Sequence, residues 1–258
     1  MKMPRKKNDL NTIYISERLQ EKLRPISRCT LTTVVAPMGY GKTTAVNWYL
    51  NERVKKGGAV VIRISIYTNN LPIFWKSVQD AFARAGFAFL REYDCPTDGA
   101  SGGLLIDDLC HALTGEKSCY IFIDDFHLLT DKRAPGFLCA LAGRLPPNVH
   151  LILASRDLFL PAAELVRLGG KVYQIGTAQL RLNHTELAVY TKRCGTALSD
   201  EQIDTLLYYS EGWFSAVYLN LRMFSEHGVL PDPNSDISSI FTAAMIDPLP
   251  EKQREFLA

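Results

Sequence analysis

The sequence predicts an α/β protein with a parallel sheet, followed by a smaller all-helical domain. Three observations lead to this fold class. An apolar, β-branched run at 30–35 is followed by a glycine-bearing loop and an amphipathic segment, which is the pattern of a strand, a loop and a helix. A second strand, at 119–123, is continuously apolar and ends in two carboxylates, as expected of a parallel strand buried on both faces. From about residue 180 onward the pattern becomes helical.

Length and composition limit the classes of protein that the chain can be. With 258 residues, 47% of them hydrophobic, it can bury one full α/β core and a satellite domain. The net charge of +2 gives no overall attraction to nucleic acid or to a membrane surface. The charged N-terminus is no signal peptide, and no apolar run reaches the roughly 18 residues that span a bilayer. The 6 cysteines lack Cys-x-x-Cys spacing, so we expect reduced thiols in a cytoplasmic protein.

The loop after the first strand matches the P-loop pattern of glycine, four residues and Gly-Lys-Ser/Thr, except that Ala36 replaces the first glycine. Alanine can occupy that position if its φ angle is negative. The backbone N–H groups of such a loop wrap a polyphosphate, and the following helix points its positive end at the same charge. Lys42 would reach the outer phosphates, and the Thr43 hydroxyl would ligate Mg²⁺. The predicted site for ATP or ADP comprises Ala36, Pro37, Met38, Gly39, Tyr40, Gly41, Lys42, Thr43 and Thr44.

The flanking segments carry ordinary helix, strand and loop signals. A short helix opens at about residue 15 and is stopped by Pro25. Because the segment ahead of a P-loop strand often lies over the adenine, Arg18 is a candidate adenine contact, with a plain surface arginine as the alternative. The elements predicted next are a strand at 59–64, a helix at 71–85 with Pro72 in its first turn, a loop at 94–103 and a helix at 104–113.

Two carboxylates, Asp124 and Asp125, follow the strand at 119–123 in the pattern of a Walker B strand. Open α/β sheets bind ligands at this carboxyl edge. Consecutive strand residues point to opposite sides, so the two should do different jobs. Asp124 would hold Mg²⁺ through water, and Asp125 would polarise the attacking water. His127 could touch the nucleotide, but a packed or hydrogen-bonded structural histidine is the favoured interpretation.

A further buried strand at 149–154 also ends in polar residues. Arg156 follows it, at the position of a γ-phosphate sensor, where an arginine can bind the terminal phosphate through two hydrogen bonds. The alternative is an ion pair between Arg156 and a neighbouring aspartate, and Arg167 is a lesser candidate. The last strand of the sheet is predicted at 171–175.

The helical part has clear start and stop signals. Capping boxes begin at Asn183 and at Ser199 and predict helices over about 186–194 and 200–210. A third helix is predicted to begin at Glu211 and to end at Gly228. The chain then stops inside a fresh helical pattern after Pro250, which leads us to expect that it is part of a longer protein.

Four stretches of the chain together resemble one known family. They are 36–44, 123–127, 155–156 and 210–213. Over roughly 12–258 the sequence resembles the nucleotide-binding module of the large ATP-binding LuxR-type transcription regulators, the group that includes the maltose-regulon activator. These belong to the signal-transduction ATPases with numerous domains, abbreviated STAND. In this family an alanine at the position of Ala36 is ordinary.

The resemblance implies a P-loop ATPase core whose sheet has an additional strand between those that carry Lys42 and Asp124. It also implies a slowly hydrolysing switch, active and self-associating with ATP and resting with ADP. An inducer would bind a sensor domain that is missing here, and DNA would be contacted only through a missing helix-turn-helix. The implied parts are a basic tail at 1–11, the core at 12–178, a helical satellite domain at 179–229, and a linker with the start of a winged helix at 230–258.

One departure from the family concerns the adenine. STAND proteins carry Gly-x-Pro at the start of the third satellite helix, and that proline touches the base. Here the segment is Gly212-Trp213-Phe214, so Phe214 is the candidate contact.

Two other function classes fit the sequence less well. A P-loop kinase would transfer the γ-phosphate to a small acceptor, but it should carry an arginine-rich lid, and a pair of aspartates suits the activation of water. A nucleic-acid motor is disfavoured by the near-zero net charge.

Overall fold

The computed structural model describes residues 13–196, 198–228 and 230. The predicted basic tail at 1–11 and all but the first residue of the predicted segment at 230–258 lie outside the described residues. The chain divides into two compact units. The sheet unit is Glu17–Leu180, and the helical unit comprises Arg181–Ala258 together with Met1–Ser16. No helix among the described residues is long and apolar enough to cross a membrane.

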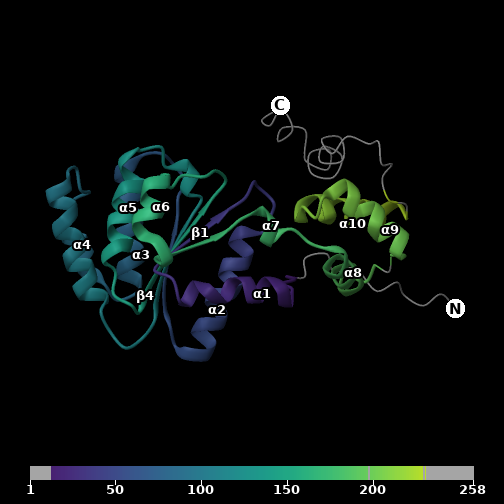
Figure 1. Ribbon diagram of the computed structural model, residues 1–258, viewed down its shortest axis with the longest axis horizontal. Helices are drawn as coiled ribbons and strands as arrows, with labels where there is room; N and C mark the ends of the chain where they lie inside the picture. The colour runs from purple at the N-terminus through teal and green to yellow at the C-terminus, as the bar shows by residue number, and fades with distance from the viewer. Residues whose placement is uncertain (1–12, 197, 229, 231–258) are drawn as a thin grey trace. The chain divides into compact units, whose positions relative to one another are not determined.

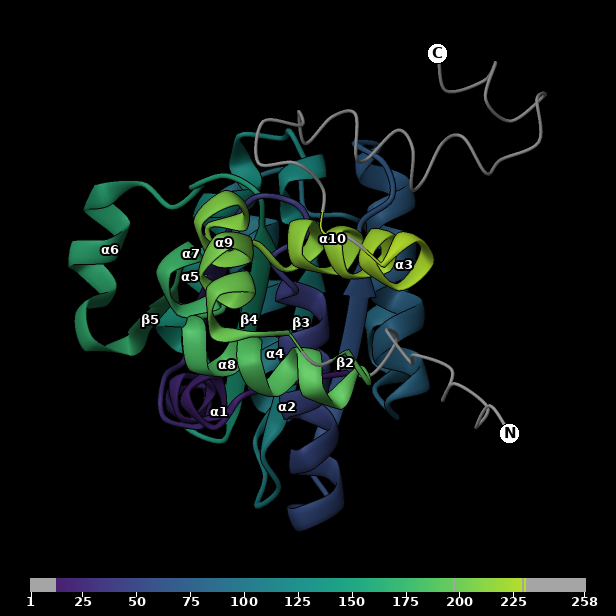
Figure 2. The same cartoon turned by 90° about the vertical axis from the view of Figure 1, so that its right-hand side faces the viewer.

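Five parallel strands form the sheet: β1 (Leu31–Val35), β2 (Val60–Ser65), β3 (Cys119–Asp124), β4 (Val149–Ser155) and β5 (Val172–Ile175). Their spatial order is β2-β3-β4-β1-β5, which can be followed across Figure 2 from β5 at the left to β2 at the right. Because β4 lies between β1 and β3, the sheet is of the additional-strand type, as predicted. Both β3 and β4 are buried along their whole length, which explains their mostly apolar sequences.

Helices cover both faces of this sheet. In Figure 1, α3 (Leu71–Arg84), α4 (Gly99–Leu113) and α5 (Arg133–Arg144) lie on one side, and α1 (Glu17–Leu23) and α2 (Lys42–Gly57) lie on the other. The first side buries Ile62, Ile121 and Leu151 in the main core. On the second side the Tyr49 ring of α2 meets the Tyr120 ring of β3 edge-on. The remaining elements of the unit are α6 (Ala162–Leu168), α7 (Thr177–Leu180), and short 3₁₀ turns at Arg24–Ser27, Ala88–Glu92, Phe126–Leu128 and Gly169–Lys171.

One sequence prediction in the sheet unit was wrong. Residues 94–103 were expected to form a loop, but α4 already begins at Gly99. The Asp98 side chain accepts hydrogen bonds from the N–H groups of Ala100 and Ser101, and the Ser101 side chain completes a capping box. These caps satisfy the first N–H groups of the helix and offset the low helix propensity of its glycines.

The helical unit contains α8 (His184–Arg193), α9 (Asp200–Ser210) and α10 (Phe214–His227). The capping boxes predicted at Asn183 and Ser199 are both present. The third helix was predicted to begin at Glu211, but it begins at Phe214, because Glu211 and Gly212 have φ angles of 49° and 73°. A Cβ atom on Gly212 would lie 2.2 Å from the Leu182 carbonyl oxygen, so only glycine fits this turn.

A compact core holds the helical unit together. It contains Leu187, Tyr190, Ile203, Leu206, Val217 and Leu221. The Tyr14 ring stacks on Tyr190 at a centroid distance of 5.8 Å. The Ser16 hydroxyl also donates a hydrogen bond to the Glu186 carboxylate, which joins the segment before α1 to this unit.

Candidate nucleotide-binding site

The loop between β1 and α2 has the backbone that its glycines require. Gly39 and Gly41 have φ angles of 81° and 75°, in the left-handed region that glycine adopts without strain. Ala36 is not among the described non-glycine residues with positive φ, so it meets the condition that the sequence set for it. Its N–H donates to the Ser155 carbonyl at 3.3 Å, which ties the start of the loop to β4.

The first turn of α2 is open to an anion. Gly41 is its N-cap residue and offers no side-chain cap, and no acidic residue occupies the first turn. The Thr43 and Thr44 residues that follow are exposed. Uncapped N–H groups at a helix N-terminus attract negative charge. The loop and α2 therefore have the form of a phosphate cradle.

Lys42 lies across the inside of this cradle. Its side chain is buried, and its Nζ atom donates to the carbonyl oxygens of Ala36 at 2.7 Å and Pro37 at 3.0 Å. Burial lowers the pKa of Lys42, while the nearby carboxylates of Asp125 and Asp124 act in the opposite direction. A buried ammonium held between a loop and two carboxylates is suited to bind phosphate oxygens.

Asp124, the last residue of β3, is buried and faces the start of α2. Its carboxylate forms a hydrogen bond with the Thr43 side chain and accepts another from the Asp125 N–H at 3.0 Å. Burial is the largest cause that raises the pKa of Asp124, and the charge of Asp125 adds to it. A carboxylate beside a threonine hydroxyl offers the hard oxygen ligands that Mg²⁺ takes. These two residues therefore fit the ion.

Asp125 does not belong to β3, so the alternation along a strand, on which the sequence prediction relied, does not apply to it. Its backbone has left the strand and lies in the left-handed region, with φ 56° and ψ 40°. About half of its side chain is exposed, whereas Asp124 is almost completely buried. The two carboxylates differ in exposure and in partners, so the structure gives them different surroundings.

His127 is buried next to Asp125. Its side chain is 11% exposed, and both ring nitrogens are buried without a hydrogen-bond partner, so it is packed, as one of the two favoured alternatives expected, but not hydrogen-bonded. Its Nδ1 atom lies 4.0 Å from an Asp125 carboxylate oxygen, beyond hydrogen-bonding distance. Burial and the positive charge of Arg156 lower the pKa of His127, which keeps the ring neutral. In the sequence, only its position two residues after Asp125 indicates that His127 lies near the predicted nucleotide site.

Arg156 lies directly after β4, next to the same group. Its charge lowers the pKa of both Lys42 and His127, which places its guanidinium near these two side chains. Among the described residues it forms no ion pair within 4.0 Å, so the alternative of a pair with a neighbouring aspartate finds no support. Arg167, the lesser candidate, is bound to Glu164 and to the Cys139 carbonyl.

Arg18 and Phe214 are the two candidate adenine contacts. Arg18 is half-buried in the first turn of α1. Phe214 belongs to the helical unit, where its ring packs against Tyr190 at a centroid distance of 5.1 Å. Their contacts with adenine stay predictions.

Comparison with known proteins agrees with this geometry. No family model matches the sequence. The HTH-type transcriptional regulator MalT of Vibrio campbellii is 20% identical over 230 residues, which cover 81% of this chain and 24% of the regulator.

Two solved structures share the fold. A Signal Transduction ATPase with Numerous Domains (STAND) protein with a tetratricopeptide repeat sensor, from Pyrococcus horikoshii, has a TM-score of 0.64 at 16% identity, covering 95% of this chain and 34% of that one. A Walker-type ATPase of Pyrococcus abyssi has a TM-score of 0.57 at 13% identity, covering 92% and 73%. This chain therefore spans about a quarter of the regulator and a third of the STAND protein. The chain has the fold of a STAND-class P-loop ATPase module.

Proposed function

We propose that this chain is the ATP-binding and slowly hydrolysing switch module of a signal-responsive bacterial transcription regulator of the cytoplasm. The observation that carries the proposal is the meeting of Lys42, Thr43 and Asp124 at the uncapped start of α2. Each of these side chains is suited to a different part of a magnesium–nucleotide complex. The similarity to MalT supports the regulatory role, which belongs to the longer protein rather than to this chain alone.

Nucleotide binding begins with an exchange of partners at Lys42. The ammonium leaves the carbonyl oxygens of Ala36 and Pro37 for the outer phosphate oxygens, while the loop N–H groups bind the remaining phosphates. Thr43 and Asp124, which hydrogen-bond to each other here, would hold Mg²⁺. The bound ion would supply positive charge that stabilises the buried Asp124 carboxylate.

The proposed base for hydrolysis is Asp125, whose side chain is half exposed. Asp125 accepts a proton from the attacking water, and its exposure lets water reach it. The buried His127 ring, which lacks a partner, completes its hydrogen bonds with Asp125 or with the terminal phosphate once nucleotide is bound. Arg156 binds the γ-phosphate and loses that contact when phosphate departs.

The change at Arg156 is the basis of the switch. With ATP the arginine is engaged and the module takes an active form that self-associates. With ADP it is free, and the module returns to a resting form. In this proposal an inducer and DNA act through further domains of a longer regulator, and MalT itself extends well beyond the matched region.

The proposal is tested by the nucleotide that the purified protein carries. The protein is denatured, and the released nucleotide is separated by chromatography and quantified against protein concentration. We expect ADP at close to one per chain, and light scattering should show a larger species only after exchange for ATP and Mg²⁺. A protein that retains no nucleotide and binds none when supplied with Mg²⁺ would contradict the proposal.

A further inference from the structure

A second site lies away from the nucleotide loop. A cavity of about 560 Å³, open to solvent on one side, lies between α3, α4 and α5 and the sheet face that they cover. Its wall is mostly apolar and includes the aromatic side chains Phe74, Trp75, Phe82, Phe126 and Phe137. None of the residues of the 36–44 loop lines it.

Glycines line part of this cavity. Three of the first five residues of α4 are glycine, although glycine is a poor helix former. A Cβ atom added at Gly103 would meet no atom within 4 Å, and the same holds at Gly136 on α5. Both residues line the cavity. A larger side chain at either position would therefore extend into open space rather than into packed atoms.

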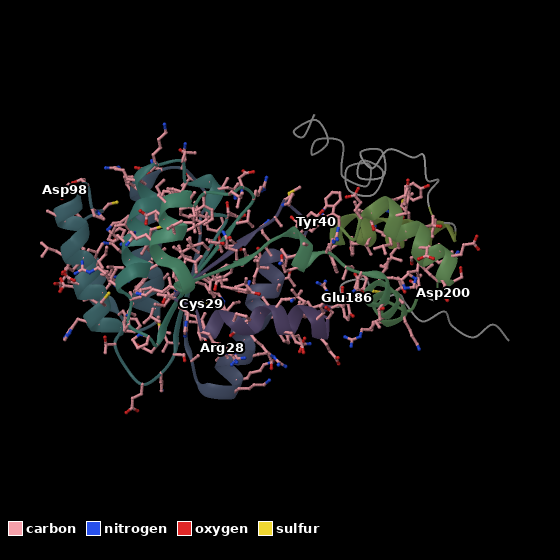
Figure 3. All side chains as sticks on the ribbon, viewed as in Figure 1. Arg28, Cys29, Tyr40, Asp98, Glu186 and Asp200 are labelled. Carbon is pink, nitrogen blue, oxygen red and sulfur yellow. The ribbon has the colours of Figure 1, made fainter. Side chains whose placement is uncertain are left out.

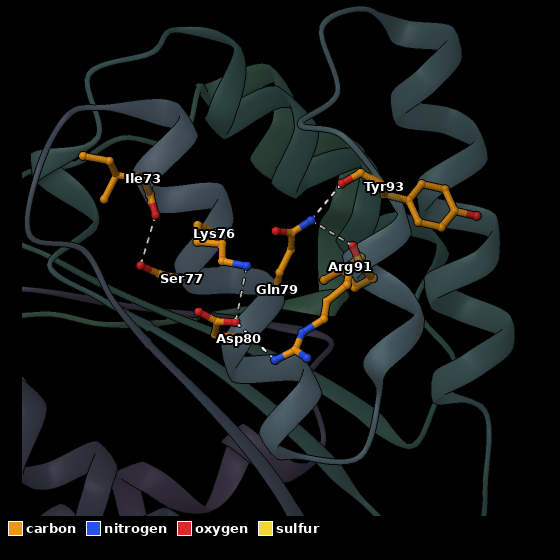
Figure 4. Close-up of polar contacts among 8 residues, drawn as sticks. Ile73, Lys76, Ser77, Gln79, Asp80, Arg91 and Tyr93 are labelled. Atoms are coloured by element: carbon orange, nitrogen blue, oxygen red, sulfur yellow. Dashed lines mark hydrogen bonds and ion pairs between the residues drawn. The ribbon is translucent and has the colours of Figure 1, made fainter.

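The wall beside α3 is held in place by hydrogen bonds, of which those made by Gln79 can be followed in Figure 4. The Gln79 side-chain amide donates to the carbonyl oxygens of Leu90 at 3.2 Å and Tyr93 at 2.9 Å. The Trp75 indole N–H donates to the same Tyr93 carbonyl at 2.9 Å. The turn after α3 is thereby fixed to the helix, and the one polar atom of Trp75 is already used inside the protein.

The charged groups at the edge of the cavity are paired with one another. Arg133 binds the Asp131 carboxylate at 2.7 Å and donates to the Thr97 carbonyl at 3.1 Å. Arg144 is paired with Asp107. The Asp98 carboxylate caps α4, at the far end of the sheet unit from Tyr40 of the nucleotide loop (Figure 3). No lining charge is left for a charged ligand, which favours a neutral one.

We propose that this cavity binds a neutral, apolar small molecule with an aromatic or alicyclic skeleton. Its volume falls within the roughly 300–1,000 Å³ typical of small-molecule sites. The aromatic wall gives such a molecule a large contact area, and burial of apolar surface supplies the affinity. This site does not include the nucleotide loop, so an experiment can refute ligand binding in the cavity without refuting nucleotide binding, and the reverse.

The test uses N-phenyl-1-naphthylamine, a neutral fluorophore that emits strongly in apolar surroundings. Titration of the whole chain, with saturating ADP and Mg²⁺ present, should show saturable binding of one probe per chain. Indole emission should fall as the probe binds, and Trp75→Phe should reduce that quenching. Two variants fill the cavity from different sides, Gly103→Phe from α4 and Ala140→Phe from α5. Gly57→Phe is the matched control, because its added ring also meets open space but lies outside the cavity.

We expect both filling variants to weaken probe binding by at least about tenfold, while Gly57→Phe binds like the wild type. Circular dichroism and thermal melting establish whether each variant is folded. If Gly103→Phe does not fold, Ala140→Phe tests the proposal instead. Absence of saturable binding by the folded wild type would overturn the proposal. Displacement of the probe by ADP, or equal binding by the folded filling variants, would also overturn it.

Discussion

Asp125→Asn separates the proposed water activation from every other property of the site. Asparagine keeps the shape of the side chain and one acceptor oxygen, but it cannot take a proton. The backbone permits the change, because Asp125 has a φ angle of 56° and asparagine is among the residues that tolerate the left-handed region. Alanine at this position would add strain of about 1–2 kcal/mol, so its effect would be harder to interpret.

A positioned general base contributes a factor of about 10²–10⁴ in rate. Single-turnover hydrolysis by Asp125→Asn should therefore fall by at least about a hundredfold. ATP should bind at least as well as in the wild type, because the substitution removes a negative charge near Lys42. In a full-length regulator of the kind proposed above, the variant should accumulate in the ATP form and activate transcription with less inducer.

The assay mixes stoichiometric ATP and Mg²⁺ with the protein and follows phosphate release, with affinity measured separately by calorimetry. Asp157→Asn is the matched control, since Asp157 is an exposed acid whose charge also reaches His127. Hydrolysis by Asp125→Asn at the wild-type rate would show that Asp125 is not the base. Loss of ATP binding by this variant would mean that the roles of the two aspartates are reversed.

Three further substitutions test the neighbouring residues. Arg156→Ala should weaken ATP binding by about tenfold to a hundredfold, because a charge-assisted contact to the γ-phosphate is worth about 1.5–3 kcal/mol, and it should leave ADP binding nearly unchanged. Calorimetric titrations with both nucleotides test this. Equal losses of affinity for ATP and ADP would indicate a structural arginine. Burial raises the pKa of Asp124 above its ordinary value of 3.8, so the folded state holds the proton more tightly than the unfolded state and the carboxylate costs stability as the pH rises above that value. Asp124→Asn should therefore raise the melting temperature of the nucleotide-free protein at pH 7, and this increase should become smaller toward pH 4. The same variant should abolish the Mg²⁺ dependence of nucleotide affinity. A lower melting temperature than the wild type at pH 7 would contradict this. His127→Leu should not lower the melting temperature, because both ring nitrogens lack partners. It should slow single-turnover hydrolysis by at least about tenfold. A destabilised variant with normal hydrolysis would indicate a purely structural histidine.

The sequence predicted the sheet and the phosphate cradle because their signals are local. The apolar run of β3 and the glycines at 39 and 41 are each determined by burial or by a φ angle that few other residues accept. The order of the strands came from the resemblance rather than from the residues, since pairing between strands far apart in the chain leaves no local signal.

Other features could not be predicted because they depend on the assembled fold. The start of α4 was missed because its glycines resemble those of a loop, and the Asp98 capping box was overlooked. The lack of any partner for the buried His127 ring nitrogens is visible only in the folded structure. The cavity beside α4 likewise arises from side chains on three helices and three strands, and no single stretch of sequence encodes it.

The central claim is that Lys42 binds the phosphates of a nucleotide in the cradle at the start of α2. Calorimetric titration of ADP with Mg²⁺ into Lys42→Ala and into Lys55→Ala tests it directly. Lys55 lies on the same helix, far from the loop, and is exposed and paired with Glu52. We predict that Lys42→Ala loses about tenfold to a hundredfold in affinity while keeping its fold, and that Lys55→Ala binds like the wild type. Unchanged ADP affinity in folded Lys42→Ala would contradict the assignment of this site.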